Sequence, residues 1–393
     1  MFNLTNKYLH LFTYLFLSYF FLTVTPFGDE PDFGIRSNQI QSLSKFVFDE
    51  FQYSDQTTEY IPSDYCDLQS IKNYNYIWYE IDKDDCQYTL TQSLKKLLFK
   101  IILLLPILTL FLFGQKISNK SDLKNDINII FISLFSTGLL YYTSLISHEV
   151  YTLVLSLAFL LFRKKLYVNF LILLLIAMID YGNSLVICAF YSFYFYLRLL
   201  KYFIKNFILI GILSLTFLIY LSSNFLLEFI PDLTLFELYK YLPAGLKKYF
   251  YHLDLHHLMN AETFGKYPII FRPIIVFLTG IYFTPKFVTS ILVIIIHSLS
   301  ILIIFYNFII KKYRININNS EEIDSWIYFI AIIMTILFFT SSFPAYCNAK
   351  YYIFTVPFII KTLSFYINTN KIFKFFLFNS LLLIFNLSIY TSI

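Results

Sequence analysis

The sequence lacks several motifs that mark soluble enzymes. It has only four cysteines, and no CxxC or combined Cys/His spacing points to structural zinc. No HExxH motif indicates a zinc hydrolase, and no P-loop pattern indicates the use of ATP or another nucleotide. The first apolar segment has no basic stretch before it and no small-residue cleavage site after it. We therefore predict an uncleaved membrane anchor at residues 8–25 rather than a signal peptide.

Charge and glycine are also scarce. Only 14% of the 393 residues are charged and 9 are glycine, whereas 58% are hydrophobic. The mean hydropathy is +0.64 and apolar runs recur along the whole chain, which predicts one all-α, polytopic membrane domain over residues 1–393. The net charge of +5 comes from short basic clusters between the apolar runs, so we predict no nucleic-acid partner.

The basic clusters predict how the chain is oriented. Residues 27–96 form an acidic segment, with thirteen acidic and four basic residues between Gly28 and Leu94. Placing this segment outside puts every short basic connection inside, among them residues 116–124, 163–165, 198–205, 311–314 and 371–374. We predict an inner N-terminus, about eleven spans, and a second outer loop at 223–286 with an interfacial or re-entrant part.

Several predicted spans are short for a bilayer. After the first span they cover residues 97–113, 127–146, 150–162, 166–179, 184–197 and 206–222. Runs of about 14 residues between 150 and 197 fall below the ~20 needed to cross, so we expect their polar ends to be drawn below the interface. No N-x-S/T sequon lies in the long outer loops, which favours a bacterial inner membrane over a glycosylating secretory membrane.

An acidic cluster directly follows the first span. Asp29, Glu30 and Asp32 surround Pro31, so one interpretation is an acidic stop to the first helix. The alternative is that one carboxylate is a general base that deprotonates a sugar hydroxyl for attack on an anomeric carbon. Arg36 is close enough in sequence to pair with this cluster or to bind a phosphate.

Other polar residues fall at the same predicted side of the membrane. His148 and Glu149 are either a tight polar turn or a second acid/base pair, and Asp180 and Asn183 are either a helix cap or a substrate-binding turn. Arg272 and Lys350 are candidates for holding a leaving diphosphate, the alternative being snorkelling to the interface. His252 and His256 are spaced like metal ligands, but without HExxH we favour a helix lying on the membrane, where His256 contacts a lipid head group. We predict no metal or other cofactor.

An apolar first span with an outer acidic cluster behind it, followed by many short-looped helices, resembles the GT-C class of integral-membrane glycosyltransferases. Within that class the chain is most similar to bacterial Wzy-type polymerases of O-antigen or capsule repeat units. The resemblance implies a catalytic acid among Asp29, Glu30 and Asp32, and binding of the saccharide diphosphate by Arg36 and Arg272. It implies transfer of a growing glycan from undecaprenyl diphosphate to the next lipid-linked unit at the periplasmic face. Its implied partners are the lipid-linked oligosaccharide, membrane lipids and a chain-length regulator.

Three other functions stay open at this stage. A single-sugar GT-C transferase with a polyprenyl-phosphate donor would use the same site. A flippase or transporter of lipid-linked saccharide would instead place polar or broken helices at the bilayer midplane, often in paired repeats. In a non-catalytic membrane scaffold the outer carboxylates would have no chemical role.

Overall fold

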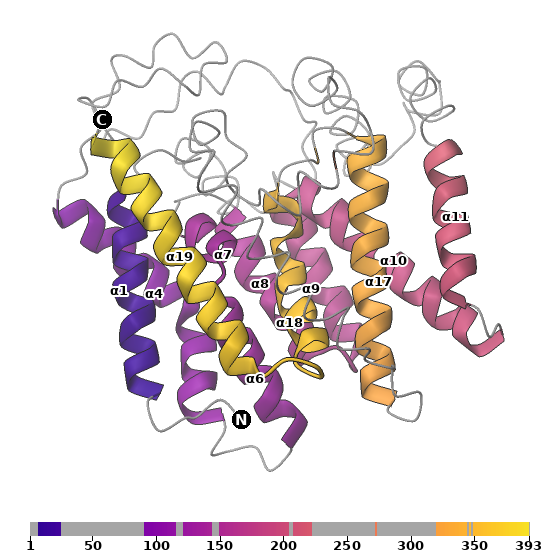
Figure 1. Cartoon of the computed structure of the whole chain (residues 1–393), viewed down its shortest axis with the longest axis horizontal. Coiled ribbons are helices and arrows are strands. Elements are labelled where there is room, and N and C mark those ends of the chain that lie inside the picture. Colours follow the sequence, from indigo (N-terminus) through magenta and orange to yellow (C-terminus); the bar gives the residue numbers. More distant parts are fainter. Residues whose placement is uncertain are drawn as a thin grey trace, which may run out of the picture.

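The computed structural model describes residues 7–24, 90–114, 121–143, 149–203, 207–221, 272, 320–343, 346 and 349–392 (Figure 1). Within these ranges every regular element is a helix and there is no strand, which confirms the predicted helical class. Most of the acidic segment and of the second outer loop lies outside the described residues. The exceptions are residues 90–96 of the acidic segment, which begin a helix, and Arg272 of the second outer loop.

The elements follow one another along the chain with short connections in its middle part. They are α1 (Lys7–Val24), α4 (Leu90–Thr109), the π-helical turn η5 (Leu110–Gly114), α6 (Ser121–Ser133), α7 (Thr137–Tyr142), α8 (Glu149–Leu161), α9 (Leu166–Ile179), α10 (Tyr181–Phe203), α11 (Phe207–Leu221), α17 (Ser320–Ser342), the 3-10 turn η9 (Ala349–Thr355), α18 (Val356–Leu363) and α19 (Thr369–Ser392).

Two described segments are long and apolar enough to cross a membrane. They are Gly182–Lys201 within α10 and Ser320–Ser342, which is α17. Five further apolar helical segments are shorter, namely Lys100–Phe113, Tyr151–Leu161, Leu166–Ile179, Ile210–Tyr220 and Tyr351–Leu363. These helices are fewer than the eleven or so spans predicted from the sequence, so that number stays a prediction.

Some helix ends differ from the sequence prediction. α4 begins at Leu90 and α10 continues to Phe203, beyond the apolar runs that the prediction used. Gln92, Lys95, Arg198 and Lys201 are good helix formers, and no glycine or proline interrupts these stretches, so the helices extend through polar residues.

The span predicted at 127–146 is broken into α6 and α7. The N–H groups of Phe135 and Ser136 bond to carbonyls three residues back, at 3.1 and 2.9 Å, so the helix tightens and stops. The Ser136 hydroxyl accepts the Leu139 N–H at 3.4 Å and caps α7. Ser380 of α19 donates to the Phe135 carbonyl at 2.7 Å, so this carbonyl at the break is paired within the protein.

The helices pack side by side around an aromatic core, with α1, α4 and α19 towards one edge and α11 at the other (Figure 1). Tyr194 of α10 stacks on Tyr328 of α17 with ring centroids 4.1 Å apart. Phe190 contacts Phe354 and Phe358, which brings η9 and α18 against the same pair of helices. α10 and α17 are therefore the centre of this part of the fold.

The exposed side chains of several outer helices are large and apolar. They include Phe12 and Phe16 of α1, Leu98 and Ile102 of α4, Phe170 and Leu171 of α9, Leu213 and Phe217 of α11, and Phe378 and Phe385 of α19. Charged residues such as Asp126, Asp180 and Lys361 are buried instead. This distribution is the reverse of that on an ordinary water-exposed helix, where the apolar face packs inward and the charged face points out.

Candidate functional site

The structure describes only part of the predicted site. Asp29, Glu30, Asp32, Arg36, His148 and His256 lie outside the described residues. Glu149 begins α8 and Lys350 lies in η9, but only their backbones are described. The side chains that can be placed are those of Asp180, Asn183 and Arg272, and all three are buried.

Asp180 forms the reversal between α9 and α10. Its backbone is extended (φ −146°, ψ 105°), and its N–H bonds to the Ile176 carbonyl at the end of α9. Its side chain accepts the Asn183 backbone N–H at 3.1 Å and the Asn183 side-chain amide at 2.5 Å. Asp180 is thus the N-cap of α10, because its carboxylate satisfies a donor in the first turn of that helix.

Arg272 is far from α17 in sequence but lies against the C-terminal end of that helix. Its Nη1 donates to the Ser341 carbonyl at 3.4 Å. The last carbonyls of a helix have no partner within the helix and carry partial negative charge, so a guanidinium here stabilises the end of α17.

Tyr346 brings these two residues into one region of the fold. It is fully buried in the connection between α17 and η9, and its ring lies 4.6 Å from that of Tyr351. Burial raises the pKa of Tyr346 well above its usual value, and Tyr351 and the Asp180 carboxylate raise it further. Asp180 and Arg272 therefore belong to the same end of the bundle, which we call the Asp180 end.

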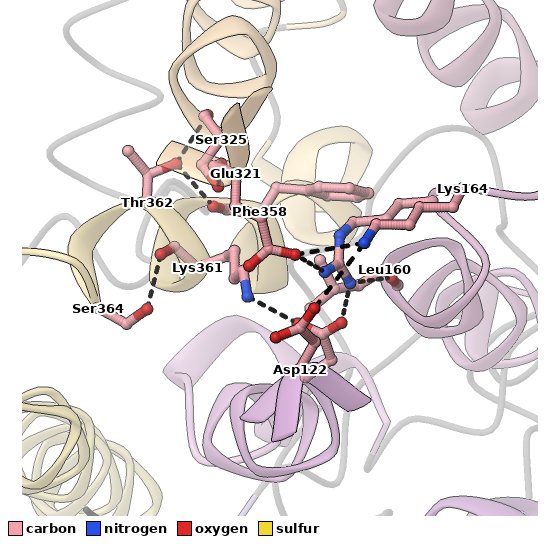
Figure 2. A network of polar contacts seen from close by, with 11 residues as sticks. Asp122, Leu160, Lys164, Glu321, Ser325, Phe358, Lys361, Thr362 and Ser364 are labelled. Atoms are coloured by element: carbon pink, nitrogen blue, oxygen red, sulfur yellow. Dashed lines mark hydrogen bonds and ion pairs between the residues drawn. The ribbon is translucent and has the colours of Figure 1, made fainter. Parts of the chain in front are cut away.

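The opposite end holds a buried ion-pair network that the sequence analysis did not predict (Figure 2). At its centre is Asp126 of α6, which pairs with Arg163 in the α8–α9 turn and with Lys361 of α18, the latter at 3.0 Å. Arg163 also contacts Glu321 at the start of α17, at 3.3 Å. We call this the Asp126 end, and one network there joins α6, the α8–α9 turn, α17 and α18.

The outer part of this network is exposed to solvent. Lys164 contacts Glu321 at 3.4 Å and Asp122 at 3.9 Å, and Figure 2 shows its side chain extending from the α8–α9 turn towards these two carboxylates. Arg163, Lys164 and Lys361 are balanced by Asp122, Asp126 and Glu321. The network is therefore close to neutral as a whole, so its ions are paired within the protein.

A second polar group ties α17 to the turn before α19. The Tyr366 hydroxyl donates to Glu322 and accepts the Trp326 indole N–H at 2.6 Å. Burial and the hydrogen bond to Glu322 raise the pKa of Tyr366 to about 12, against the opposing effect of the Trp326 hydrogen bond. These contacts fix the start of α17 against the α18–α19 turn.

Lys100 is a further buried cation, in the middle of α4. Its Nζ donates to the Leu140 carbonyl of α7 at 3.4 Å and lies 5.7 Å from the centre of the Tyr14 ring of α1. A lysine inside an apolar run is a sequence signal for a buried partner or a functional site. For Asp126 the sequence signal is that this carboxylate, like the acids at 321, 322 and 324, lies at the predicted inner side, where the basic connections also lie.

Among the residues that the structure describes, no three His, Cys, Asp or Glu side chains are placed so that they could hold a metal ion. Comparison of the chain with protein-family models, with curated protein sequences and with solved structures finds no match.

Proposed function

We propose that this chain is a multi-pass protein of a bacterial inner membrane, with about eleven spans and the Asp180 end on the outer side. Two helices of sufficient length, five shorter apolar ones and the exposed apolar faces of α1, α4, α9, α11 and α19 support a lipid environment. The basic connection at 163–165, together with Lys371 and Lys374 in the first turns of α19, favours an inner location for the Asp126 end.

The proposed activity is glycosyl transfer between lipid-linked saccharides at the Asp180 end. A carboxylate among Asp29, Glu30 and Asp32 deprotonates the acceptor hydroxyl, which attacks the anomeric carbon of the donor while the lipid diphosphate leaves. The proposed product is an O-antigen or capsular polysaccharide built from repeat units, with the diphosphate ester as the source of free energy. The resemblance described above supplies this activity as a hypothesis.

One observation in the described residues supports the proposal. Asp180 with Asn183, and Arg272, come from distant parts of the sequence, yet they are buried at one end of the bundle, where Asp180 acts on Tyr346 and Arg272 bonds to the Ser341 carbonyl. Carboxylate and amide groups suit sugar hydroxyls, and a guanidinium suits a diphosphate oxygen because it offers a planar set of donors. In this proposal Arg272 stabilises the charge that develops on the leaving diphosphate.

The test must separate helix capping from chemistry, since Asp180 and Arg272 both occupy helix ends. Asp180→Asn keeps an N-cap residue but removes the charge, and Arg272→Gln keeps a donor for the Ser341 carbonyl but removes the guanidinium. Both should be expressed in source cells that lack the gene, with Lys374→Gln as the control for loss of an exposed positive charge. Membrane levels of each variant are measured by immunoblot.

The measurement is mass spectrometry of lipid-linked saccharides extracted from these cells, together with gel analysis of the surface glycan. We expect Arg272→Gln, and at least one of Asp29→Asn, Glu30→Gln and Asp32→Asn, to give glycan of one repeat unit at normal protein level. Long chains from all of these variants would refute the transferase. Accumulation of the lipid-linked unit on the inner side of the membrane only, with no repeat unit on the surface glycan, would indicate a flippase instead.

A further inference from the structure

A cavity of about 230 Å³ lies at the Asp126 end, between the α8–α9 turn, α10, α17 and α18. The stacked rings of Tyr194 and Tyr328 and the buried side chains of Leu160 and Phe358 form its apolar wall. The volume is smaller than the 300 Å³ or more that is usual for drug-sized ligands. It suits a head group or similar small polar moiety rather than an oligosaccharide.

The cavity presents charges of both signs. Arg163, Lys164, Arg198 and Lys361 line it, and so do Glu321 and Asp324. Two further carboxylates, Asp122 and Asp126, pair with these basic residues from outside the lining. Four basic and four acidic residues thus balance, so a ligand of single charge would meet as much repulsion as attraction. A ligand that carries one positive and one negative group avoids this conflict.

An exposed apolar face begins at the rim of the cavity. Leu166, the first residue of α9, lines the cavity and is also 39% exposed. Phe170 and Leu174 follow it at intervals of four residues along the same side of α9, and both are exposed. A molecule whose polar group lies in the cavity therefore has an apolar surface along which a hydrocarbon chain can lie.

We propose that this cavity binds the head group of a zwitterionic phospholipid with a primary ammonium, such as phosphatidylethanolamine. The ammonium lies against Glu321 and Asp324, the phosphate lies against Lys164 and Arg198, and an acyl chain follows the exposed face of α9. The inference rests on the membrane location proposed above and is independent of glycosyl transfer.

The test is native mass spectrometry of the full-length protein, purified in detergent and delipidated, with dioleoyl lipids as probes. Phosphatidylethanolamine should bind more tightly than phosphatidylcholine, whose quaternary ammonium cannot donate hydrogen bonds to carboxylates, and more tightly than anionic phosphatidylglycerol. Asp324→Asn and Arg198→Gln should each weaken phosphatidylethanolamine binding about 10-fold, as expected for loss of one charged hydrogen bond. Lys374→Gln, at an exposed site on α19, should leave binding unchanged.

Each alternative result has a definite meaning. Equal binding of phosphatidylethanolamine and phosphatidylcholine, or binding that neither variant weakens, would refute the head-group site. Preference for phosphatidylglycerol would also refute it, by showing an anion site instead. Recovery of the expressed protein in the soluble fraction would refute the membrane location itself, whereas failure of lipid binding alone would leave the transferase proposal standing.

Discussion

Removing the charge of Asp126 should lower the free energy of unfolding more than removing the charge of any other residue in the network. Asp126 has a side chain that is only 2% exposed, and its carboxylate lies 3.0 Å from Lys361, whose side chain is 5% exposed. Asp126→Asn preserves the shape of the residue but leaves Lys361 and Arg163 facing each other with less compensating charge. Breaking a buried pair in this way costs about 3–5 kcal/mol of the free energy of unfolding.

The same network provides a matched control. The side chain of Lys164 is 70% exposed, although it also contacts two carboxylates. Water and salt screen such a pair, so Lys164→Met should cost no more than about 1 kcal/mol. The double variant Asp126→Asn with Lys361→Met should be more stable than the sum of the single effects predicts, by at least about 1 kcal/mol, because it removes both partners.

The assay is unfolding by SDS in mixed micelles, followed by tryptophan fluorescence. The chain has two tryptophans, so a Trp78→Phe background makes Trp326 the reporter, close to the network. An Asp126→Asn protein as stable as Lys164→Met would show that the buried pairs contribute no more than an exposed one. Strict additivity in the double variant would show that Asp126 and Lys361 do not interact.

Three further predictions use the same unfolding assay. Asp180→Ala should cost about 1 kcal/mol because α10 loses its N-cap, whereas Asp180→Asn should change stability by less than half as much. The pKa of Tyr366 is raised from 10.0 to about 12, so the stability it contributes should be complete below pH 10 and lost as pH rises from 10 to 12; Tyr366→Phe should flatten this loss, and an unchanged slope would contradict it. Gly211→Ala places a Cβ 2.6 Å from the buried Leu197 side chain, so crowding should outweigh the gain in helix propensity and cost about 1 kcal/mol; a more stable variant would show that Leu197 can move aside.

The sequence predicted a helix correctly wherever a change in polarity coincides with a helix end. α9 was predicted at 166–179 and spans Leu166–Ile179, because Lys165 and Asp180 bound a run in which Asn169 is the one strongly polar residue. α11 is one residue shorter at each end than the predicted 206–222. α10 was predicted too short because its charged last turns continue the helix, and charge alone does not end one.

The Asp126 network was not predictable from local sequence. The basic cluster at 163–165 satisfies the rule for membrane orientation, so nothing in its own neighbourhood requires a partner. The carboxylate partners of Arg163 and Lys164 come from α6 and α17. Asp126, Arg163 and Lys361 meet only when three distant segments pack together. The turn between α6 and α7 was missed for a similar reason, since the Phe135 carbonyl that it frees is paired by Ser380 of α19.

The two ends of the bundle differ in what a ligand would have to displace. At the Asp126 end, a ligand that recruits the Asp126 carboxylate or Lys361 must break buried ion pairs, at a cost of several kcal/mol. At the Asp180 end, Asp180 accepts hydrogen bonds from the backbone and side-chain amides of Asn183, and Arg272 donates to the Ser341 carbonyl, contacts for which neutral polar residues can substitute. Folding and chemistry are therefore separable at the Asp180 end. A stable Asp180→Asn, Arg272→Gln double variant with normal glycan would mean that these two residues only cap helices, and the search for the reacting groups would then move to the acidic segment.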